Sequence, residues 1–359
     1  MNQRLINFFM DIVRIDSESG DEEAVISFLQ QILERELDAQ CLIDEYGNLL
    51  ARIGAKGCSR SESIVLSTHA DTVKPGRGIE PILVDSFIRS KGDTILGGDD
   101  KAGIAEILEA LRSARKHPPI EWIVTRSEEI GLLGAKHFDP SNLKGKMGFL
   151  LDSDAIDTIV TGGPSHVNLE VEITGRAAHA GMEPEKGISA IQAAAYSISK
   201  MELGRLDQES TANVGVISGG TVRNAVPAKA TILAECRSLN HEKCMNQAEA
   251  MKALFEEGAK AFGASAAIKM ELDYRAMEIP EDARPVTIAR RALERCGISP
   301  NIRKITGGTD ASILNNKGIQ MAILGTGVRD EHTTEESVSI PEMEKAVEVL
   351  QGIFADLCP

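Results

Sequence analysis

The chain has 359 residues, of which 42% are hydrophobic and 26% charged, so it is long enough to form two globular domains. Its net charge of −15 argues against nucleic acid and anionic membrane as partners, and favours a soluble protein that acts on small molecules. No stretch approaches the roughly 18 apolar residues of a membrane span. Asp11 interrupts the first apolar stretch, so we expect an amphipathic helix there and no signal peptide.

Six cysteines are scattered along the chain, and none of them forms a Cys-x-x-Cys pair. We expect them to be reduced thiols in a cytoplasmic protein. Any metal site would then have to be built from His, Asp and Glu side chains. The cysteines are Cys41, Cys58, Cys236, Cys244, Cys296 and Cys358.

The first part of the chain has two helical patterns followed by strands. Helical periodicity covers residues 3–15 and about 21–37, and a hairpin is expected between Cys41 and Ile53. A short apolar strand then ends in His69 and Asp71. Residues two apart on an extended chain share a face, which suits a histidine metal ligand with a carboxylate beside it. A single His-x-Asp is a weak signal by itself.

A glycine turn and two aspartates, Asp99 and Asp100, precede a helix expected over residues 101–115. One interpretation is an ordinary aspartate cap at a helix start. The other is a carboxylate held for chemistry at a strand-to-helix corner. The two adjacent aspartates allow both interpretations together.

The strand predicted over Ile120–Thr125 is followed by the adjacent pair Glu128 and Glu129. Neighbouring side chains on an extended chain point to opposite sides, so one carboxylate could bind a metal while the other handles protons. An isolated Glu-Glu pair is more often a solvated acidic patch.

Another apolar strand, Met147–Leu151, ends in Asp152 and Asp154. Three consecutive strands therefore carry His, Asp or Glu residues at their carboxyl ends. In an open α/β sheet, ligands bind at that edge. The sequence thus predicts an α/β domain with a functional site at the carboxyl edge of its sheet.

The pattern changes after Gly162-Gly163-Pro164, where apolar and polar residues begin to alternate as on a one-sided sheet. The order of elements up to about residue 274 is β-α-β-β-α-β, which is typical of a small two-layer α+β domain. An α/β rhythm resumes afterwards. We therefore expect one domain from 1–163 and 275–359, with 164–274 inserted into it.

Several further motifs lie between and after the residues described above. Together with the residues above, this set resembles the dinuclear zinc exopeptidase and aminoacylase superfamily, and within it the peptidase T branch. Carboxypeptidase G, acetylornithine deacetylase and succinyl-diaminopimelate desuccinylase belong to the same superfamily. The added motifs are Ala178-His179-Ala180-Gly181, the stretch from Gly219 to Pro227, Gly307-Gly308-Thr309-Asp310, and His332.

The resemblance implies a three-layer αβα catalytic domain and a ferredoxin-like inserted domain that serves as lid and dimerisation domain of a homodimer. It also implies two Zn²⁺ ions per subunit. His69 and Asp152 would bind one ion, Glu129 and His332 the other, and Asp99 would bridge them. Sites of this composition also accept Co²⁺ or Mn²⁺.

Further roles follow from the resemblance. Asp71 would hold the imidazole of His69, and Glu128 would be the general base. From the inserted domain, His179 and Asn224 would approach the scissile carbonyl, with His179 reaching across a dimer, and Arg237 would grip a substrate carboxylate. The family also suggests a cis peptide bond between the two aspartates at 99 and 100.

The charges of this ligand set agree with hydrolysis. Two Zn²⁺ ions and three carboxylates leave one positive charge, so a bridging water would ionise readily to hydroxide. Two metal ions about 3.5–4 Å apart can activate that water and polarise the substrate carbonyl together. Glu128 would take the proton and return it to the leaving amine.

The sequence departs from the peptidase T pattern at two places near the expected substrate pocket. Thr306 stands where an arginine precedes Gly-Gly-Thr-Asp, and Asp330-Glu331 stands where a glycine-lysine pair precedes the final histidine. Both changes remove positive charge and leave the ligand set intact. We expect a metal-dependent aminopeptidase of tripeptidase type. The alternatives are an N-acyl-amino-acid deacylase and a non-catalytic peptide-binding module, although binding alone would not need Glu128.

Overall fold

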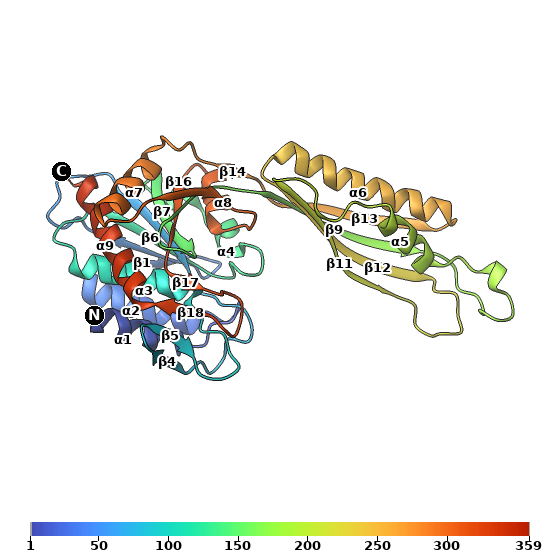
Figure 1. The fold of residues 1–359 in the computed structure, drawn as a ribbon, viewed down its shortest axis with the longest axis horizontal. Helices are drawn as coiled ribbons and strands as arrows, with labels where there is room; N and C mark the ends of the chain where they lie inside the picture. Colours follow the sequence, from blue (N-terminus) through green and yellow to red (C-terminus); the bar gives the residue numbers. More distant parts are fainter. Residues whose placement is uncertain (1, 359) are drawn as a thin grey trace. The chain divides into compact units, whose positions relative to one another are not determined.

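The computed structural model describes residues 2–358, which form two compact units, each with its own hydrophobic core (Figure 1). The first unit contains the described chain up to Gly162, then Glu278–Lys304, and then the chain from Thr309 onward. The second unit contains Gly163–Met277 and the short segment Ile305–Gly308. An α/β unit with an α+β unit inserted into it is the predicted fold class, which is thereby confirmed.

The first unit is built on a nine-stranded sheet in the order β1-β2-β6-β3-β7-β16-β8-β14, with β15 paired to β8. Strands β6, β3, β7 and β16 run parallel, so their carboxyl ends lie at one edge of the sheet. The strands are β1 (Gln40–Ile43), β2 (Leu49–Ile53), β3 (Ile64–His69), β6 (Ile120–Thr125), β7 (Met147–Ser153), β8 (Thr158–Gly163), β14 (Met277–Glu278), β15 (Asn301–Lys304) and β16 (Gln320–Gly325).

Helices cover both faces of this sheet and make the first unit three-layered. Helices α1, α2, α3, α7 and α9 share one core with sheet residues such as Leu66, Trp122 and Phe149. Helix α8 packs on β16 and against α4, with buried residues outside that core. The helices are α1 (Gln3–Val13), α2 (Glu23–Leu37), α3 (Gly98–Ser113), α4 (Leu133–His137), α7 (Arg284–Arg295), α8 (Asp310–Asn316) and α9 (Ile340–Leu357), with a 3-10 turn at Pro140–Asn142.

A second, four-stranded sheet in the first unit was not predicted. Its order is β17-β18-β5-β4, and it pairs Val338 of β18 with Ile88 of β5. Strands of two to four residues are too short to show a period of two in a sequence, and these come from two segments more than 230 residues apart. The strands are β4 (Pro81–Val84), β5 (Phe87–Ser90), β17 (Val328–Arg329) and β18 (Ser337–Ser339).

The second unit is an antiparallel sheet in the order β10-β11-β12-β9-β13, with two helices on it (Figure 1). Alternate residues of β9, from Val167 to Ile173, are buried in the core that this sheet forms with the helices. The elements are β9 (Ser165–Thr174), α5 (Ala190–Ser199), β10 (Gly204–Arg205), β11 (Ser210–Gly219), β12 (Lys229–Ser238), α6 (His241–Ala261) and β13 (Ser265–Tyr274), with a 3-10 turn at Pro184–Lys186.

The expectation of six reduced thiols is wrong for two cysteines. Cys58 and Cys358 form a disulfide across a sequence separation of 300 residues. The partners meet only because the folded chain brings its last residues beside the loop after β2, so their spacing carries no sequence signal. Cys41, Cys236 and Cys244 are free, as is Cys296. None of the helices within residues 2–358 combines the length and apolar character that a membrane span requires.

Removing the disulfide is expected to lower the free energy of unfolding by about 2–4 kcal/mol, because the bond closes a long loop in the unfolded chain. The measurement is urea unfolding of a Cys58→Ser, Cys358→Ser double variant against the unaltered protein in non-reducing buffer. Cys41→Ser, which removes a free thiol on an edge strand, is the control. Equal unfolding midpoints for the double variant and the unaltered protein would contradict this expectation.

Candidate metal centre and active site

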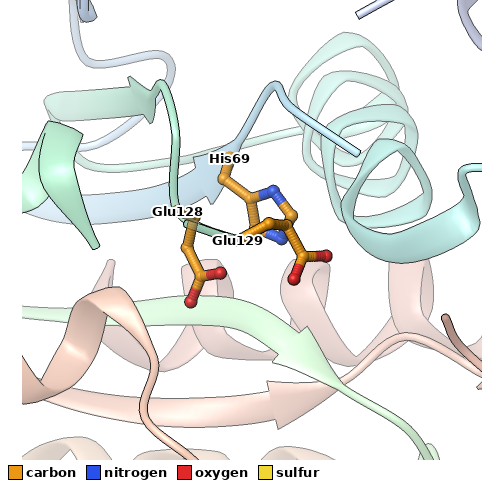
Figure 2. A group of neighbouring side chains, drawn as sticks. All are labelled: His69, Glu128 and Glu129. Carbon is orange, nitrogen blue, oxygen red and sulfur yellow. The ribbon is translucent and has the colours of Figure 1, made fainter. Parts of the chain in front are cut away.

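Three neighbouring strands of the large sheet carry the polar residues expected at their ends. Strands β6, β3 and β7 are adjacent and parallel. His69 is the last residue of β3, Glu128 and Glu129 follow β6, and Asp152 lies near the end of β7. Figure 2 shows His69 close to the two glutamates, whose side chains extend in different directions. The parallel arrangement therefore brings all four residues to one edge.

Asp99 is shared between two groups of metal-type ligands. His69, Asp99 and Asp152 form one group and Asp99, Glu129 and His332 another, with the ligand atoms of each group within 4.8 Å of one another. Oδ1 of Asp99 lies 3.1 Å from Nε2 of His69, and Oδ2 lies 3.2 Å from Nε2 of His332. A carboxylate that faces two imidazoles in this way has the geometry of a bridging ligand.

The other contacts in the cluster are also short. Oε1 of Glu129 lies 2.8 Å from Nε2 of His332, and Oδ1 of Asp152 lies 3.8 Å from Nε2 of His69. The side chain of His69 is 2% exposed, whereas that of His332 is 50% exposed. The cluster is thus closed on the sheet side and open beside His332, and catalytic metal sites keep such an open position.

The charges of the cluster call for a cation. Burial raises the pKa of Asp152 to about 7, and the Asp99 carboxylate adds to that rise. The carboxylates of Asp99 and Glu129 raise the pKa of His332 to about 10, so these groups hold a proton between them. A metal ion would take the place of that proton. Two imidazole nitrogens and three carboxylates fit Zn²⁺, and equally Co²⁺ or Mn²⁺.

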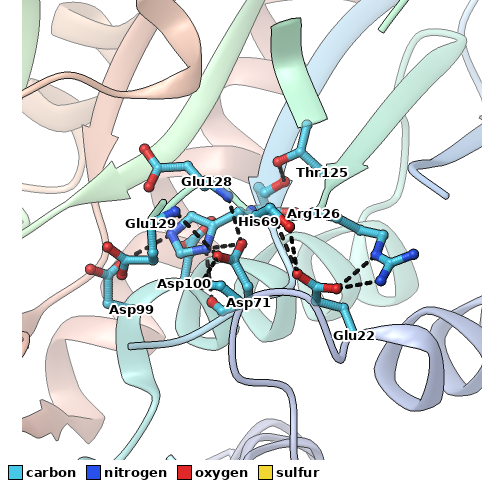
Figure 3. Close-up of polar contacts among 12 residues, drawn as sticks. Glu22, His69, Asp71, Asp99, Asp100, Thr125, Arg126, Glu128 and Glu129 are labelled. Carbon is cyan, nitrogen blue, oxygen red and sulfur yellow. Dashed lines mark hydrogen bonds and ion pairs between the residues drawn. The ribbon is translucent and has the colours of Figure 1, made fainter. Parts of the chain in front are cut away.

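Asp71 contacts more than the histidine it was expected to hold. Nδ1 of His69 lies 2.9 Å from the backbone oxygen of Asp71 and 3.5 Å from its carboxylate. The carboxylate accepts hydrogen bonds from the backbone N–H groups of Glu128 at 2.9 Å and Glu129 at 3.2 Å, and from the Ser19 hydroxyl at 2.7 Å (Figure 3). Asp71 therefore positions the glutamate pair as well as the imidazole.

Glu22 supports the turn between β6 and the glutamate pair, and the sequence analysis did not identify it. Its buried carboxylate accepts hydrogen bonds from the backbone N–H of Ser127 at 3.1 Å and from the Ser127 hydroxyl at 3.0 Å. It also pairs with Arg126 at 2.6 Å (Figure 3). Ser127 has a φ of 55°, a left-handed conformation that these bonds hold in place. No local pattern links Glu22 to a turn 105 residues later.

Two further buried carboxyl groups lie around the cluster. Asp100 accepts a hydrogen bond from the backbone N–H of His69 at 3.1 Å, and the Asp99–Asp100 peptide bond is cis, as the resemblance implied. Asp310, at the start of α8, accepts a hydrogen bond from the Thr125 hydroxyl. Burial raises the pKa of Glu128 well above its usual range, and the charges of Asp152 and Asp310 add to the rise.

Two of the expected substrate-binding residues lie together in the second unit. His179 forms an isolated bridge with Ala225, and the backbone N–H of Ala180 donates to the backbone oxygen of Asn224 at 3.0 Å. Nδ1 of His179 accepts hydrogen bonds from the backbone at Gly181 and Met182, both at 3.1 Å. The side chains of His179 and Asn224 are exposed, so Nε2 of His179 is the ring nitrogen available to a ligand.

Arg237 lies on β12 of the second unit in a polar cluster. Its guanidinium donates to Glu235 at 3.0 Å, and Glu235 also contacts Nε2 of His166 at 2.7 Å. Nδ1 of His166 lies 3.1 Å from Asp273. The contacts with His166 and Arg237 lower the pKa of Glu235 to about 2, although burial opposes the shift. A carboxylate thus holds Arg237 in a defined orientation.

Comparison with known proteins gives relatives that match along the whole chain. Residues 162–262 match the M20 peptidase dimerisation domain. The uncharacterised protein YqjE of Bacillus subtilis is 37% identical over 99% of this chain and 98% of its own. The crystal structure of aminopeptidase PepT from Bacillus cereus has a TM-score of 0.91 at 37% identity, covering 99% of both chains. A tripeptidase structure from Staphylococcus aureus has a TM-score of 0.94 at 34% identity, covering 99% of this chain and 98% of that one.

These similarities cover both units, the sheet edge with the ligand cluster and the inserted α+β unit. The chain belongs to the M20 peptidase family, among its peptidase T-like members. It is a metal-dependent enzyme that hydrolyses peptide bonds. The predicted family and enzyme class are confirmed.

Proposed function

We propose that this chain is an aminopeptidase that cleaves short peptides, tripeptides in particular, with two Zn²⁺ ions per subunit. The observation that carries the proposal is the carboxylate of Asp99, which faces His69 in one ligand group and His332 in another. Two structural relatives, the Bacillus cereus aminopeptidase and the Staphylococcus aureus tripeptidase, support the choice of substrate.

In this proposal the two ions occupy the two ligand groups. His69 and Asp152 would hold one ion, Glu129 and His332 would hold the other, and Asp99 would be shared between them. Bound there, the ions would supply a water of lowered pKa and would polarise the scissile carbonyl. The count of two follows from the two imidazoles, since His69 and His332 lie in separate ligand groups that share Asp99.

Glu128 is the proposed general base. It lies on the same turn as Glu129, and one of its carboxylate oxygens lies within 4.8 Å of ligand atoms of His69 and Glu129. It would take a proton from the attacking water and deliver it to the nitrogen of the leaving amine. Asp71 accepts a hydrogen bond from the backbone N–H of Glu128, which limits the movement of the turn that carries this carboxylate.

We further propose that residues 1–163 and 275–359 form the catalytic domain and that residues 164–274 act as lid and dimerisation domain of a homodimer. The match to a dimerisation domain supports this assignment. His179 and Asn224 would approach the scissile carbonyl, and Arg237 would bind a substrate carboxylate. The buried Nε atom of Arg237 has no hydrogen-bond acceptor within residues 2–358, and a substrate carboxylate that reached it would satisfy this N–H group.

The substrate class can be tested with a tripeptide and its N-acetylated form. We expect the free-amine tripeptide to be cleaved with a kcat/KM at least tenfold higher, about 1.4 kcal/mol of transition-state stabilisation. Acetylation removes a positive charge, and the exposed residues Asp330 and Glu331 beside His332 attract that charge. Cleavage of the acetylated form alone would instead support the N-acyl-amino-acid deacylase.

We propose that the enzyme works in the cytoplasm. Four free thiols are typical of a reducing compartment, whereas the Cys58–Cys358 disulfide is typical of an oxidising one. Cell fractionation followed by immunoblotting of the protein distinguishes the two. Recovery in the cytoplasmic fraction supports the proposal, and recovery outside the cytoplasm contradicts it.

A further inference from the structure

Glu336 is a buried acid close to the ligand cluster that the mechanism above does not use. It is 1% exposed, and its carboxylate accepts hydrogen bonds from three backbone N–H groups. Oε2 accepts from Leu96 at 2.8 Å and Gly97 at 2.7 Å, and Oε1 accepts from Asp99 at 3.0 Å. All three donors lie at the corner that leads into α3 (Gly98–Ser113).

These N–H groups need a partner from elsewhere in the chain. The first N–H groups of a helix have no acceptor within the helix, and a negative charge near them is favourable. The residue before α3, Gly97, has no side chain that could cap it. A carboxylate 240 residues away from Leu96 in sequence satisfies the corner instead.

Glu336 also belongs to the segment that carries His332. It lies four residues after His332 and directly before β18, which pairs with β5. Its own backbone N–H donates to the backbone oxygen of Thr333 at 3.2 Å, and the Thr333 hydroxyl donates to the backbone oxygen of Asp330 at 2.7 Å. His332 has a φ of 63°, a conformation that the surrounding segment has to maintain.

The corner that leads into α3 packs closely against the segment that runs from His332 to β18. A Cβ atom at Gly98 would lie 2.6 Å from Cγ2 of Val338 and 3.1 Å from Oε1 of Glu336. Only glycine therefore allows the corner to approach this near to the β18 segment. One carboxylate thus connects the backbone of Asp99 to the loop of His332, two residues that share a ligand group.

We propose that Glu336 is a positioning residue that sets the distance between Asp99 and His332 and thereby forms the metal pocket they share with Glu129. The inference rests on the proposed roles of these residues as metal ligands. Loss of the carboxylate leaves three buried N–H groups unpaired and frees the two segments from each other. The pocket of His69 and Asp152, which also contains Asp99, should lose less metal affinity. Its other two ligands lie on β3 and β7, whereas the hydrogen bonds that the Glu336 carboxylate accepts within residues 2–358 come from Leu96, Gly97 and Asp99.

The test is metal binding, measured without reference to turnover. Purified metal-free protein is dialysed against a series of free Co²⁺ concentrations, and bound ion is counted per subunit and followed by its visible absorption. The variant is Glu336→Gln, which keeps the side-chain size but places an amide N–H₂ against the backbone donors. Glu335→Gln is the matched control, since it removes the same charge from the exposed neighbouring residue.

We expect the unaltered protein and Glu335→Gln to bind two ions per subunit. Glu336→Gln should bind one ion with nearly unchanged affinity and the second at least tenfold more weakly. Excess metal should restore much of its kcat with little change in KM. If Glu336→Gln binds both ions with the affinities of the unaltered protein, the inference is wrong.

A second variant covers the case in which Glu336→Gln does not fold. Glu336→Asp keeps the charge but is shorter by one methylene group, so it cannot reach all three donors, and it should show the same selective loss of one ion. A residue with a purely structural role would lower the melting temperature of the metal-free protein and leave both metal affinities unchanged. Failure of the unaltered protein to bind two ions would contradict the proposed ligand set, and this inference with it.

Discussion

Replacing Glu128 by Ala is expected to lower kcat on a free-amine tripeptide by about 10²- to 10⁴-fold, the usual contribution of a general base. The metal content should remain that of the unaltered protein. The substitution removes the carboxylate but leaves the backbone N–H of residue 128 bonded to Asp71, so the turn and Glu129 stay in place. The measurements are steady-state kinetics and bound metal per subunit on the same preparation.

Two further substitutions sharpen this test. Glu128→Gln keeps the shape without a proton acceptor and should be as inactive as the alanine variant, whereas Glu128→Asp keeps a carboxylate and should retain more turnover. Glu128 also lies in a possible ligand group with His69 and Glu129. Loss of metal from Glu128→Ala would therefore make it a ligand, and unchanged turnover would reject it as the base.

Replacing Asp99 by Ala is expected to weaken the binding of both metal ions and to abolish detectable turnover. Asp99 lies both in the group with His69 and Asp152 and in the group with Glu129 and His332. Its Oδ1 atom faces the imidazole of His69 and its Oδ2 atom that of His332. In the unaltered protein, Zn²⁺ at 100 times its dissociation constant should stabilise the fold by about 2.7 kcal/mol. The Asp99→Ala protein should show little of this rise in thermal unfolding temperature.

Variants with one ligand removed provide the comparison for Asp99. Asp152→Ala lies in the His69 group alone and His332→Ala takes away only the other imidazole, so each should retain one ion. The unaltered protein should therefore bind two ions per subunit, and Asp152→Ala and His332→Ala should each bind one. The Asp99→Ala protein should bind fewer than one. An Asp99→Ala protein that still binds two ions would show that Asp99 is not the bridge.

Much of the fold could be predicted from sequence because its signals are local. The strand Ile120–Thr125 was predicted with its observed ends, and the alternation of β9 from Val167 to Ile173 gave the one-sided sheet of the second unit. Consecutive parallel strands present their carboxyl ends at one edge, so three strand ends with His, Asp or Glu indicated one site. The ligand set itself was implied by the resemblance to a known family, which rests on the motifs and their order along the chain.

Other features had no local signal. The four-stranded sheet joins strands of two to four residues from two segments far apart in sequence, and Glu336 directly precedes its strand β18. The Cys58–Cys358 disulfide spans 300 residues, and its prediction as two thiols was wrong. Each depends on contacts that form only after the chain has folded.

The sequence alone determined the kinds of side chain available for chemistry and the strands that carry them, since residue type and periodicity are local properties. The tertiary structure decided which of these side chains share an ion pocket, with Asp99 between His69 and His332. It also decided which buried carboxylates hold the site, because Glu22 and Glu336 reach backbone N–H groups 105 and 240 residues away. A buried carboxylate must find donors wherever the fold places them, and sequence distance does not limit that choice.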